Sequence, residues 1–245
     1  MNSWTARKSS NRRRAQTAPP QENDEPRGGI VTRVEFQKRL GSERCNVHID
    51  GAYAFSLAAD IAQSLREGQE VDATSVRALL ERDAAERAYQ RALQFLAPRP
   101  RSSSEVRRRL AEYGCDPNAV SAAIERLASS GLVDDSAFAA YWIGQRQTFH
   151  PRGPRALRSE LYTKGVDRAT IDAAIVTDEH EQVEAARRAA ERKAVSLSAL
   201  SEREFERSIT AFLVRRGFDY SVTRDAVRRL WIDVHDENGA SLASE

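Results

Sequence analysis

The sequence contains few of the residues that build the common chemical sites of proteins. Of its 245 residues, only two are cysteines and four are histidines. Cys45 and Cys115 are too few for a disulfide framework, and no histidines stand at the spacing that would complete a zinc site with them. The glycine-rich nucleotide loops and the G-x-S-x-G hydrolase motif are also absent. We therefore expect no catalytic residue, no metal and no cofactor, and a binding protein rather than an enzyme.

Long hydrophobic runs are missing as well. No stretch approaches the roughly 18 apolar residues of a membrane span, and residues 1–28 contain no apolar segment typical of a secretion signal. Charged residues make up 30% of the chain. These features predict a reduced, cytoplasmic protein without a membrane partner. We expect a monomer, because a stack of repeats with polar ends need not close on itself.

Charge is unevenly distributed, although the formal net charge is only +2. Residues 1–14 carry five basic side chains and no acid, and residues 98–110 carry five arginines against one glutamate. Residues 144–168 are also rich in basic side chains, whereas residues 231–245 are acidic. Such asymmetry indicates an anionic partner for the basic stretches. Ordinary solvated helix surfaces, with pairs such as Glu105–Arg109, also produce charge runs, so one arginine alone carries little weight.

The N-terminal third changes character twice. Residues 1–28 are polar, basic and proline-containing, which predicts a disordered tail. Residues 29–73 alternate between apolar and polar around residues 34–36 and 45–49, and then show helical spacing over residues 56–66. This pattern predicts a small β-hairpin or meander covered by one helix. From residue 74 the pattern is helical as far as Leu96, with a possible break near Asp83.

Three glycines mark an internal repeat. Gly114, Gly165 and Gly217 each follow a leucine by four residues and precede an aspartate by two. An Ala-Ile or Ala-Val pair ends ten residues after each glycine. This order predicts a helix, a left-handed glycine cap, and a second helix capped by the aspartate. A further helix precedes each unit, at about residues 83–97, 135–147 and 179–195.

The repeat predicts a mainly α protein. Its three tandem three-helix repeats, in an elongated curved array, occupy residues 74–130, 131–177 and 178–235. Residues 236–245 follow as an acidic tail. The third repeat departs in one place, because Thr223 stands where Val120 and Ile171 predict an apolar side chain.

Three segments resemble the signatures of the RecX family, which are bacterial regulators of the RecA recombinase. Residues 101–114 resemble the opening signature, and residues 131–139 resemble the hallmark Leu-x-Asp-Asp-x-x-Phe-Ala. Residues 152–166 resemble Gly-x-x-Arg-Ile-x-x-Glu-Leu-x-x-Lys-Gly-Ile. The resemblance is strong over residues 88–176, and residues 200–232 match in pattern only. The structural hallmark residues are Gly114, Asp134, Asp135, Phe138, Gly153, Gly165 and Gly217.

The resemblance implies both a fold and a function. The fold is three tandem three-helix repeats, with residues 29–87 similar to the β-hairpin extension of some members. The implied function is to bind the RecA–ssDNA filament in its helical groove and to inhibit its extension, ATPase, strand exchange and co-protease activity. Such a protein regulates RecA in DNA repair, DNA recombination and the SOS response.

A basic stripe is the predicted partner-binding surface. On a helix of 3.6 residues per turn, Arg108 points nearly opposite to the apolar face that contains Val106. The residues expected to contact RecA or phosphate are Arg99, Arg101, Arg107, Arg108, Arg146, Arg152, Arg155, Arg158, Tyr162 and Lys164. Asp134 and Asp135 are interpreted as helix caps rather than metal ligands. Phe138, Tyr141 and Trp142 are interpreted as packing residues.

A helix-turn-helix protein that acts directly on single- or double-stranded DNA is the alternative. The glycine turn between two short helices favours it, and a recognition helix should then follow the turn. Residues 117–127 contain Asn118, Ser121 and Arg126, but the helix at 168–175 has mainly acidic or apolar side chains. The arginines precede the turn, where they suit phosphate or acidic-protein contacts better than base reading.

Overall fold

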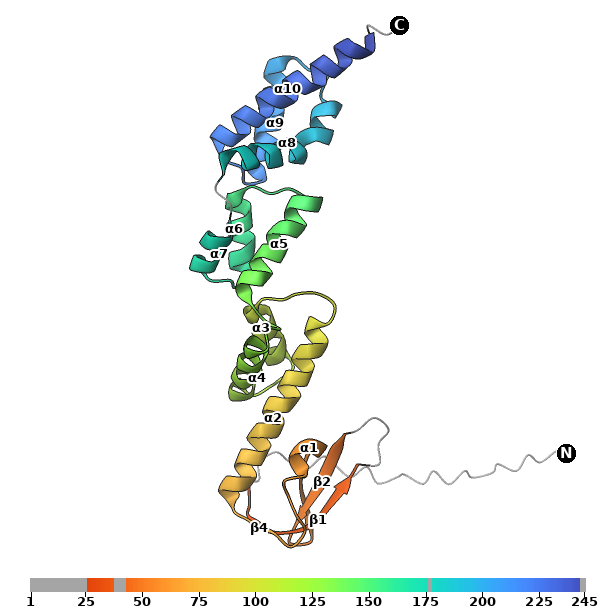
Figure 1. The fold of residues 1–245 in the computed structure, drawn as a ribbon, viewed down its shortest axis with the longest axis vertical. Coiled ribbons are helices and arrows are strands. Elements are labelled where there is room, and N and C mark those ends of the chain that lie inside the picture. The colour runs from red at the N-terminus through yellow and green to blue at the C-terminus, as the bar shows by residue number, and fades with distance from the viewer. Residues whose placement is uncertain (1–25, 38–42, 176–177, 243–245) are drawn as a thin grey trace, which may run out of the picture. The chain divides into compact units, whose positions relative to one another are not determined.

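The structure, a computed structural model, is mostly helical (Figure 1). It describes residues 26–37, 43–175 and 178–242, so most of the predicted tail 1–28 lies outside the described residues. The chain divides into two units, Met1–Leu80 and Glu81–Glu245. The first holds a small sheet and the second holds the helical repeats. The division lies inside one helix, after the boundary at residue 73 that the sequence suggested.

The N-terminal unit contains an antiparallel sheet of strand order β3-β2-β1-β4. β1 (Gly29–Phe36), β2 (Arg44–Ile49) and β3 (Ala52–Ala58) form the predicted meander. The two residues between β2 and β3, Asp50 and Gly51, both have positive φ, at 50° and 82°. β4 (Glu70–Val71) pairs with the start of β1 and was not predicted, because two residues are too few to show alternation.

Of the helix predicted over residues 56–66, only a short middle part is present, because the prediction is wrong at both ends. Residues 56–58 belong to β3, and α1 (Ala59–Ala62) is a single turn. The spacing of Leu57 and Ile61 fits a helix, but Ser56 and Leu57 pair with β2 opposite Asn46 and Cys45. Pairing with a neighbouring strand therefore decided the conformation of this segment. Leu57 and Ile61 are nevertheless both buried in the core of the unit.

One long helix, α2 (Ala73–Leu96), continues from the first unit into the second. Val76, Leu79 and Leu80 belong to the core of the sheet unit, whereas Ala88 and Ala92 belong to the core of the first repeat. The break suggested near Asp83 is absent, and the helix is continuous. The same helix thus serves two cores with different parts of its length.

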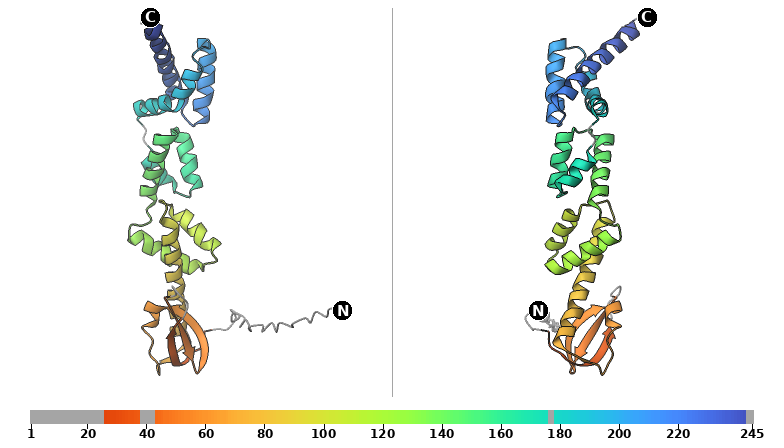
Figure 2. Two further views of the ribbon diagram at one scale, coloured as in Figure 1. Left: turned by 90° about the vertical axis from the view of Figure 1, so that its right-hand side faces the viewer. Right: turned by 60° about the vertical axis from the view of Figure 1, so that its left-hand side comes forward.

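The second unit repeats one three-helix arrangement, which confirms the predicted repeats. The first repeat consists of the later part of α2 with α3 (Ser103–Glu112) and α4 (Pro117–Ser129). The second consists of α5 (Asp135–Phe149), α6 (Pro154–Thr163) and α7 (Arg168–Ala174). The third consists of α8 (Glu179–Ser196), α9 (Glu202–Arg215) and α10 (Tyr220–Leu242). Within each repeat the three helices lie close together in both views of Figure 2. Each repeat also buries its own hydrophobic core.

The glycine turns have the predicted left-handed conformation. Gly114, Gly165 and Gly217 have φ values of 70°, 78° and 87°. Asp116 then caps α4 and Asp167 caps α7 by accepting hydrogen bonds from backbone N–H groups. A residue with a Cβ would be strained at the three glycines, which explains their fixed place in the repeat.

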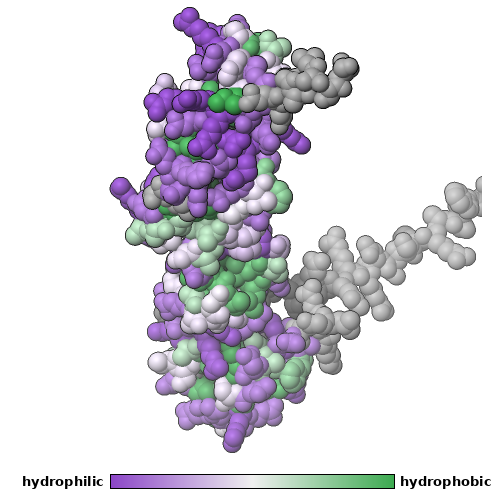
Figure 3. Space-filling model, turned by 45° about the horizontal axis from the view of Figure 1, so that its top comes forward, coloured by the Kyte–Doolittle hydropathy of each residue, from purple (hydrophilic) through white to green (hydrophobic). Residues whose placement is uncertain are grey.

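The third repeat departs from the other two at Thr223, as the sequence indicated, and its last helix is longer than expected. Thr223 is fully buried, and its hydroxyl has no hydrogen-bond partner in the described part of the chain. The backbone of α10 continues to Leu242, so the predicted acidic tail 236–245 begins as helix. On the face shown in Figure 3, hydrophilic residues cover much of the surface and hydrophobic residues lie in separate areas.

Candidate functional site

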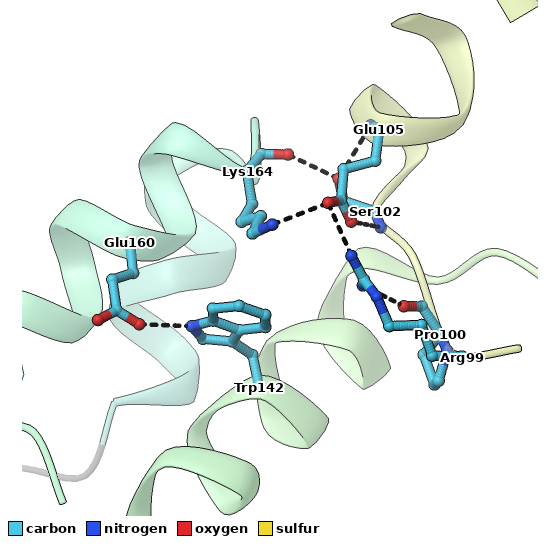
Figure 4. Close-up of polar contacts among 7 residues, drawn as sticks. All are labelled: Arg99, Pro100, Ser102, Glu105, Trp142, Glu160 and Lys164. Atoms are coloured by element: carbon cyan, nitrogen blue, oxygen red, sulfur yellow. Dashed lines mark hydrogen bonds and ion pairs between the residues drawn. The ribbon is translucent and has the colours of Figure 1, made fainter. Parts of the chain in front are cut away.

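Part of the predicted basic stripe joins the first repeat to the second (Figure 4). Ser102 caps α3, and its hydroxyl donates a hydrogen bond of 2.6 Å to the carbonyl oxygen of Lys164 at the end of α6. The side chain of Glu105 is only 5% exposed. Its Oε1 accepts hydrogen bonds from Lys164 Nζ at 2.9 Å and from Arg99 Nη2 at 3.3 Å. Arg99 and Lys164 therefore neutralise a buried carboxylate within the chain.

The electrostatics of Glu105 favour its ionised form. Burial by itself would raise the pKa of this carboxyl group, but hydrogen bonds and charge from Lys164 and Arg99 together hold the pKa below its ordinary value. The pair Glu105–Arg109 suggested by the sequence is wrong, because Arg109 instead pairs with Glu112 at 2.9 Å. Glu105 also accepts from the backbone N–H of Ser102, completing a capping box.

A second acidic residue, Glu160, pairs with cationic side chains of the second repeat. Glu160 Oε2 accepts hydrogen bonds from Trp142 Nε1 at 2.9 Å and from Arg146 Nε at 2.7 Å. Arg152 Nε lies 3.6 Å from the other oxygen of Glu160. Lys164 Nζ and the guanidinium of Arg146 also lie over the Trp142 ring, at 4.8 and 4.6 Å from its centroid. Arg146 and Arg152 are thus already paired inside the second repeat, whereas Lys164 pairs with Glu105 of the first repeat and contacts the Trp142 ring of its own.

The hallmark aspartates have different roles. Asp134 caps α5, as predicted, by accepting from the N–H groups of Ser136 and Ala137. Asp135 does not cap its own helix. It accepts hydrogen bonds from the backbone N–H and the hydroxyl of Ser103, at 2.8 and 2.6 Å, and so ties α5 to the start of α3. Phe138 is buried in the core, as predicted.

The second and third repeats are joined through glycine backbone. Gly153 N–H donates to the carbonyl of Arg216 at 3.0 Å, and Arg155 N–H donates to the carbonyl of Gly217 at 3.3 Å. A Cβ at Gly153 or Gly217 would overlap the backbone facing it. At the other junction, a Cβ at Gly165 would overlap Ser104. In both cases the glycine turn of one repeat packs against the helix start of the preceding repeat.

The remaining residues of the predicted stripe face outward. Arg107 and Arg108 on α3 are exposed and form no ion pair among the described residues. Arg155 is exposed, with one hydrogen bond of 3.2 Å to the carbonyl of Val214. Arg158 is 45% exposed and pairs with Asp172 at 3.2 Å, and Tyr162 is 75% exposed. Because exposed ion pairs contribute little stability, Arg158 can exchange its partner at low cost.

A shallow groove lies beside these residues between α6 and α7. It is lined by Arg158, Ser159, Tyr162, Arg168, Ile171 and Asp172. Arg101 belongs to neither group, because its guanidinium stacks on the ring of Phe95 at 4.1 Å from the centroid. The stripe predicted as one surface is therefore divided between repeat junctions and solvent-facing positions.

Sequence reasoning missed the acids that organise the junctions. Glu105 and Glu160 were treated as minor charges among arginines. The signal for Glu105 was present, because Ser102 and Glu105 have the S-x-x-E spacing of a capping box. Trp142 was expected only to pack, whereas its indole N–H also holds Glu160. In the described residues no cluster of side chains suits a metal ion, and no helix there is long and apolar enough to cross a membrane.

The fold and the site together define a tandem helical-repeat protein with an N-terminal sheet. Four family models match the chain. They describe the first, second and third three-helix domains of RecX, at residues 88–127, 134–175 and 180–227, and the regulatory protein RecX N-terminal domain, at residues 29–72. The chain belongs to the RecX family of regulatory proteins.

Curated relatives named Regulatory protein RecX support this assignment. The one from Bacillus licheniformis is 31% identical over 213 residues, which cover 86% of this chain and 80% of the relative. The one from Bacillus subtilis is 30% identical over 204 residues, which cover 82% and 77%. The one from Levilactobacillus brevis is 37% identical over 148 residues, which cover 60% of this chain and 55% of the relative.

Two solved structures share the fold. A crystal structure of regulatory protein RecX has 28% sequence identity and a TM-score of 0.66, and the match covers 80% of this chain and 97% of that one. The crystal structure of RecX from Lactobacillus salivarius has 26% identity and a TM-score of 0.56. Its match covers 60% of this chain and 97% of the other.

Proposed function

We propose that this protein is a non-enzymatic, cytoplasmic regulator that binds the RecA–ssDNA filament. It inhibits filament extension, ATP hydrolysis, strand exchange and co-protease activity, and so acts in DNA repair, recombination and the SOS response. Membership of the RecX family supports the proposal, since the resemblance implies RecA as the partner. The single observation that carries it is a set of outward-facing arginines on successive repeats that the repeat junctions do not use.

The arginines proposed to meet RecA occupy equivalent places in two repeats. Arg107 precedes Gly114 by seven residues, and Arg158 precedes Gly165 by the same number. Arg108 on α3 and Tyr162 on α6 are exposed beside them. Arginine and tyrosine are enriched in protein interfaces, where both combine large contact area with directed hydrogen bonds. Acidic side chains of RecA are the expected partners of these residues.

Direct reading of DNA by the helices after the glycine turns has less support. Arg126 on α4 forms an ion pair of 2.6 Å with Glu86, and its guanidinium stacks on Tyr89 at 3.8 Å. On α7, Arg168 Nε lies 3.6 Å from Asp172. Two of the arginines on these helices are thus paired within the chain, which leaves them less suited to contact base edges.

The test is the ssDNA-dependent ATPase of RecA with and without this protein, at well below one copy per RecA subunit. We expect ATP hydrolysis to fall, and we expect Arg107→Glu/Arg108→Glu to weaken the inhibition because it reverses two exposed charges. The control is Arg192→Glu/Arg228→Glu, which makes the same charge change at exposed positions of the third repeat. No inhibition by the folded, unmodified protein would contradict the proposal.

A further inference from the structure

Five side chains of the first repeat alternate between cation and aromatic ring, and we call them the arginine–aromatic ladder. In order they are Arg101, Phe95, Arg109, Tyr113 and Arg91. Successive distances from guanidinium carbon to ring centroid are 4.1, 5.9, 4.4 and 5.6 Å. All four lie within the roughly 6 Å at which a cation is attracted to the face of a ring.

Two neighbouring helices build the ladder from one spacing. Arg91 and Phe95 are four residues apart on α2, and Arg109 and Tyr113 are four residues apart at the end of α3. Side chains at this spacing lie on the same helix face. Arg101 comes from the connection between the two helices. Phe95 also packs on the hydrophobic core of the first repeat, and this packing holds its ring in place between Arg101 and Arg109.

The ladder carries positive charge that the chain does not fully neutralise. Arg101 forms no ion pair or hydrogen bond among the described residues, and the Nε atoms of Arg101 and Arg109 are buried without an acceptor. Burial lowers the pKa of Arg101, and the charge of Arg99 lowers it further. Glu112 pairs with Arg109, and the charge of Glu105 offsets part of the effect on the pKa of Arg101. An anion at the accessible ends of these guanidinium groups would therefore reduce the repulsion among the cations of the ladder.

The chemistry of a stacked guanidinium favours a carboxylate or phosphate oxygen as that anion. When the guanidinium lies flat against a ring, its in-plane N–H groups stay available as hydrogen-bond donors. Two of these donors match the two oxygens of a carboxylate in a bidentate pair. A lysine at the same place would supply charge without this fork. The ladder is thus suited to directed anion recognition and not only to general attraction.

The surroundings of the ladder favour a protein over a nucleic acid. Phe95 and Tyr113 each already contact two guanidinium groups, so neither ring is left open for a base to stack on. Arginine and aromatic residues are enriched in protein interfaces.

We propose that the arginine–aromatic ladder is a docking surface for an acidic segment of a protein partner. Carboxylates of that segment pair with the guanidinium groups of Arg101 and Arg109. This surface is distinct from Arg107 and Arg108, which lie on another face of α3. The inference goes beyond the proposed function, because it holds whether or not the partner is RecA.

The experiment is fluorescence anisotropy with the full chain and a fluorescein-labelled peptide of alternating glutamate and serine. We expect Arg101→Lys/Arg109→Lys to raise the Kd about tenfold, because both charges remain while the fork and the stacking are lost. The matched control, Arg192→Lys/Arg228→Lys in the third repeat, should leave the Kd unchanged. A second variant, Phe95→Leu, keeps an apolar contact with the core but removes the ring, and should weaken binding several-fold.

Three results would overturn the inference. The first is failure of the unmodified protein to bind the peptide. The second is the same Kd for both lysine double variants, which would reduce the binding to net charge. The third is tighter binding of a labelled oligothymidylate with the same net charge as the peptide, which would make the ladder a nucleic-acid surface. Circular dichroism of each variant confirms that the helices remain folded.

Discussion

At the scale of single residues, Gly217 is needed for two separate physical reasons, whereas Gly114 is needed for only one. Both have a left-handed backbone, with φ of 87° and 70°. A Cβ at Gly114 would meet open space, but a Cβ at Gly217 would overlap the backbone of Ala156 in the preceding repeat. The same turn thus has a conformational role in every repeat and a packing role where another repeat adjoins it.

We expect Gly217→Ala to destabilise the protein more than Gly114→Ala. Each substitution costs about 1–2 kcal/mol, because a residue with a Cβ is strained in the left-handed region. Gly217→Ala must in addition separate α6 from the turn after α9. Equilibrium urea unfolding followed by circular dichroism measures the difference in free energy of unfolding. Equal losses of unfolding free energy for the two variants would show that the junction between these repeats accommodates the added Cβ without a further free-energy cost.

At the scale of elements, local patterns predicted most of the helices but few of the contacts between them. The leucine and glycine positions define the ends of α3 and α6, and the aspartates define the starts of α4 and α7, because these signals act within a few residues. The segment at 56–66 was wrong because pairing with β2, which is not local, decided its conformation. The role of Glu105 was missed for the same reason, since Lys164 lies 59 residues away along the chain.

The candidate site shows the same limit. Helical geometry correctly predicted that Arg108 lies away from the apolar face of α3, and both Arg108 and the neighbouring Arg107 are exposed. It did not distinguish them from Arg99, Arg146 and Lys164, which have partners on other helices. Periodicity identifies the face of a helix, but it does not identify what that face meets. Which arginines bind a partner molecule therefore stays a prediction.

The junction between α3 and α6 should weaken in acid. Burial would raise the pKa of Glu105, but Lys164 and Arg99 lower it more, so the folded protein holds this carboxyl group below its ordinary pKa of 4.5. Its contribution to stability is then complete above about pH 4.5 and is lost as the pH falls through the lower, folded pKa. We expect Glu105→Gln to make the fall in unfolding free energy below pH 4.5 less steep.

The measurement is urea unfolding of both proteins at several pH values from neutral to about pH 3. Lys164→Met provides a second variant, because it removes one of the two cations that lower the pKa of Glu105 and keeps much of the aliphatic stem. It should flatten the same part of the profile to a smaller extent. If the unfolding free energies of Glu105→Gln and the unmodified protein fell in parallel as the pH was lowered, Glu105 would have the same pKa in the folded and unfolded states.

At the scale of the whole molecule, stability is divided among separate cores. The sheet unit buries Val31, Val47 and Leu57, together with Val76 of α2. Each of the three repeats buries a cluster of its own. Tandem repeats of this kind gain stability from their internal packing and from contacts with the next repeat. Damage to one core is therefore expected to act mainly on its own unit.

Leu57→Ala and Leu213→Ala test this division, because both leucines have 0% exposure and lie in different units. Each truncation should destabilise its own core by about 2–5 kcal/mol. Native-state hydrogen exchange should show faster exchange of the β1–β3 amides for Leu57→Ala and unchanged protection in α8–α10, with the reverse for Leu213→Ala. If either substitution accelerated exchange in both regions equally, the whole chain would unfold as one cooperative structure, and the two units would not be independent in stability.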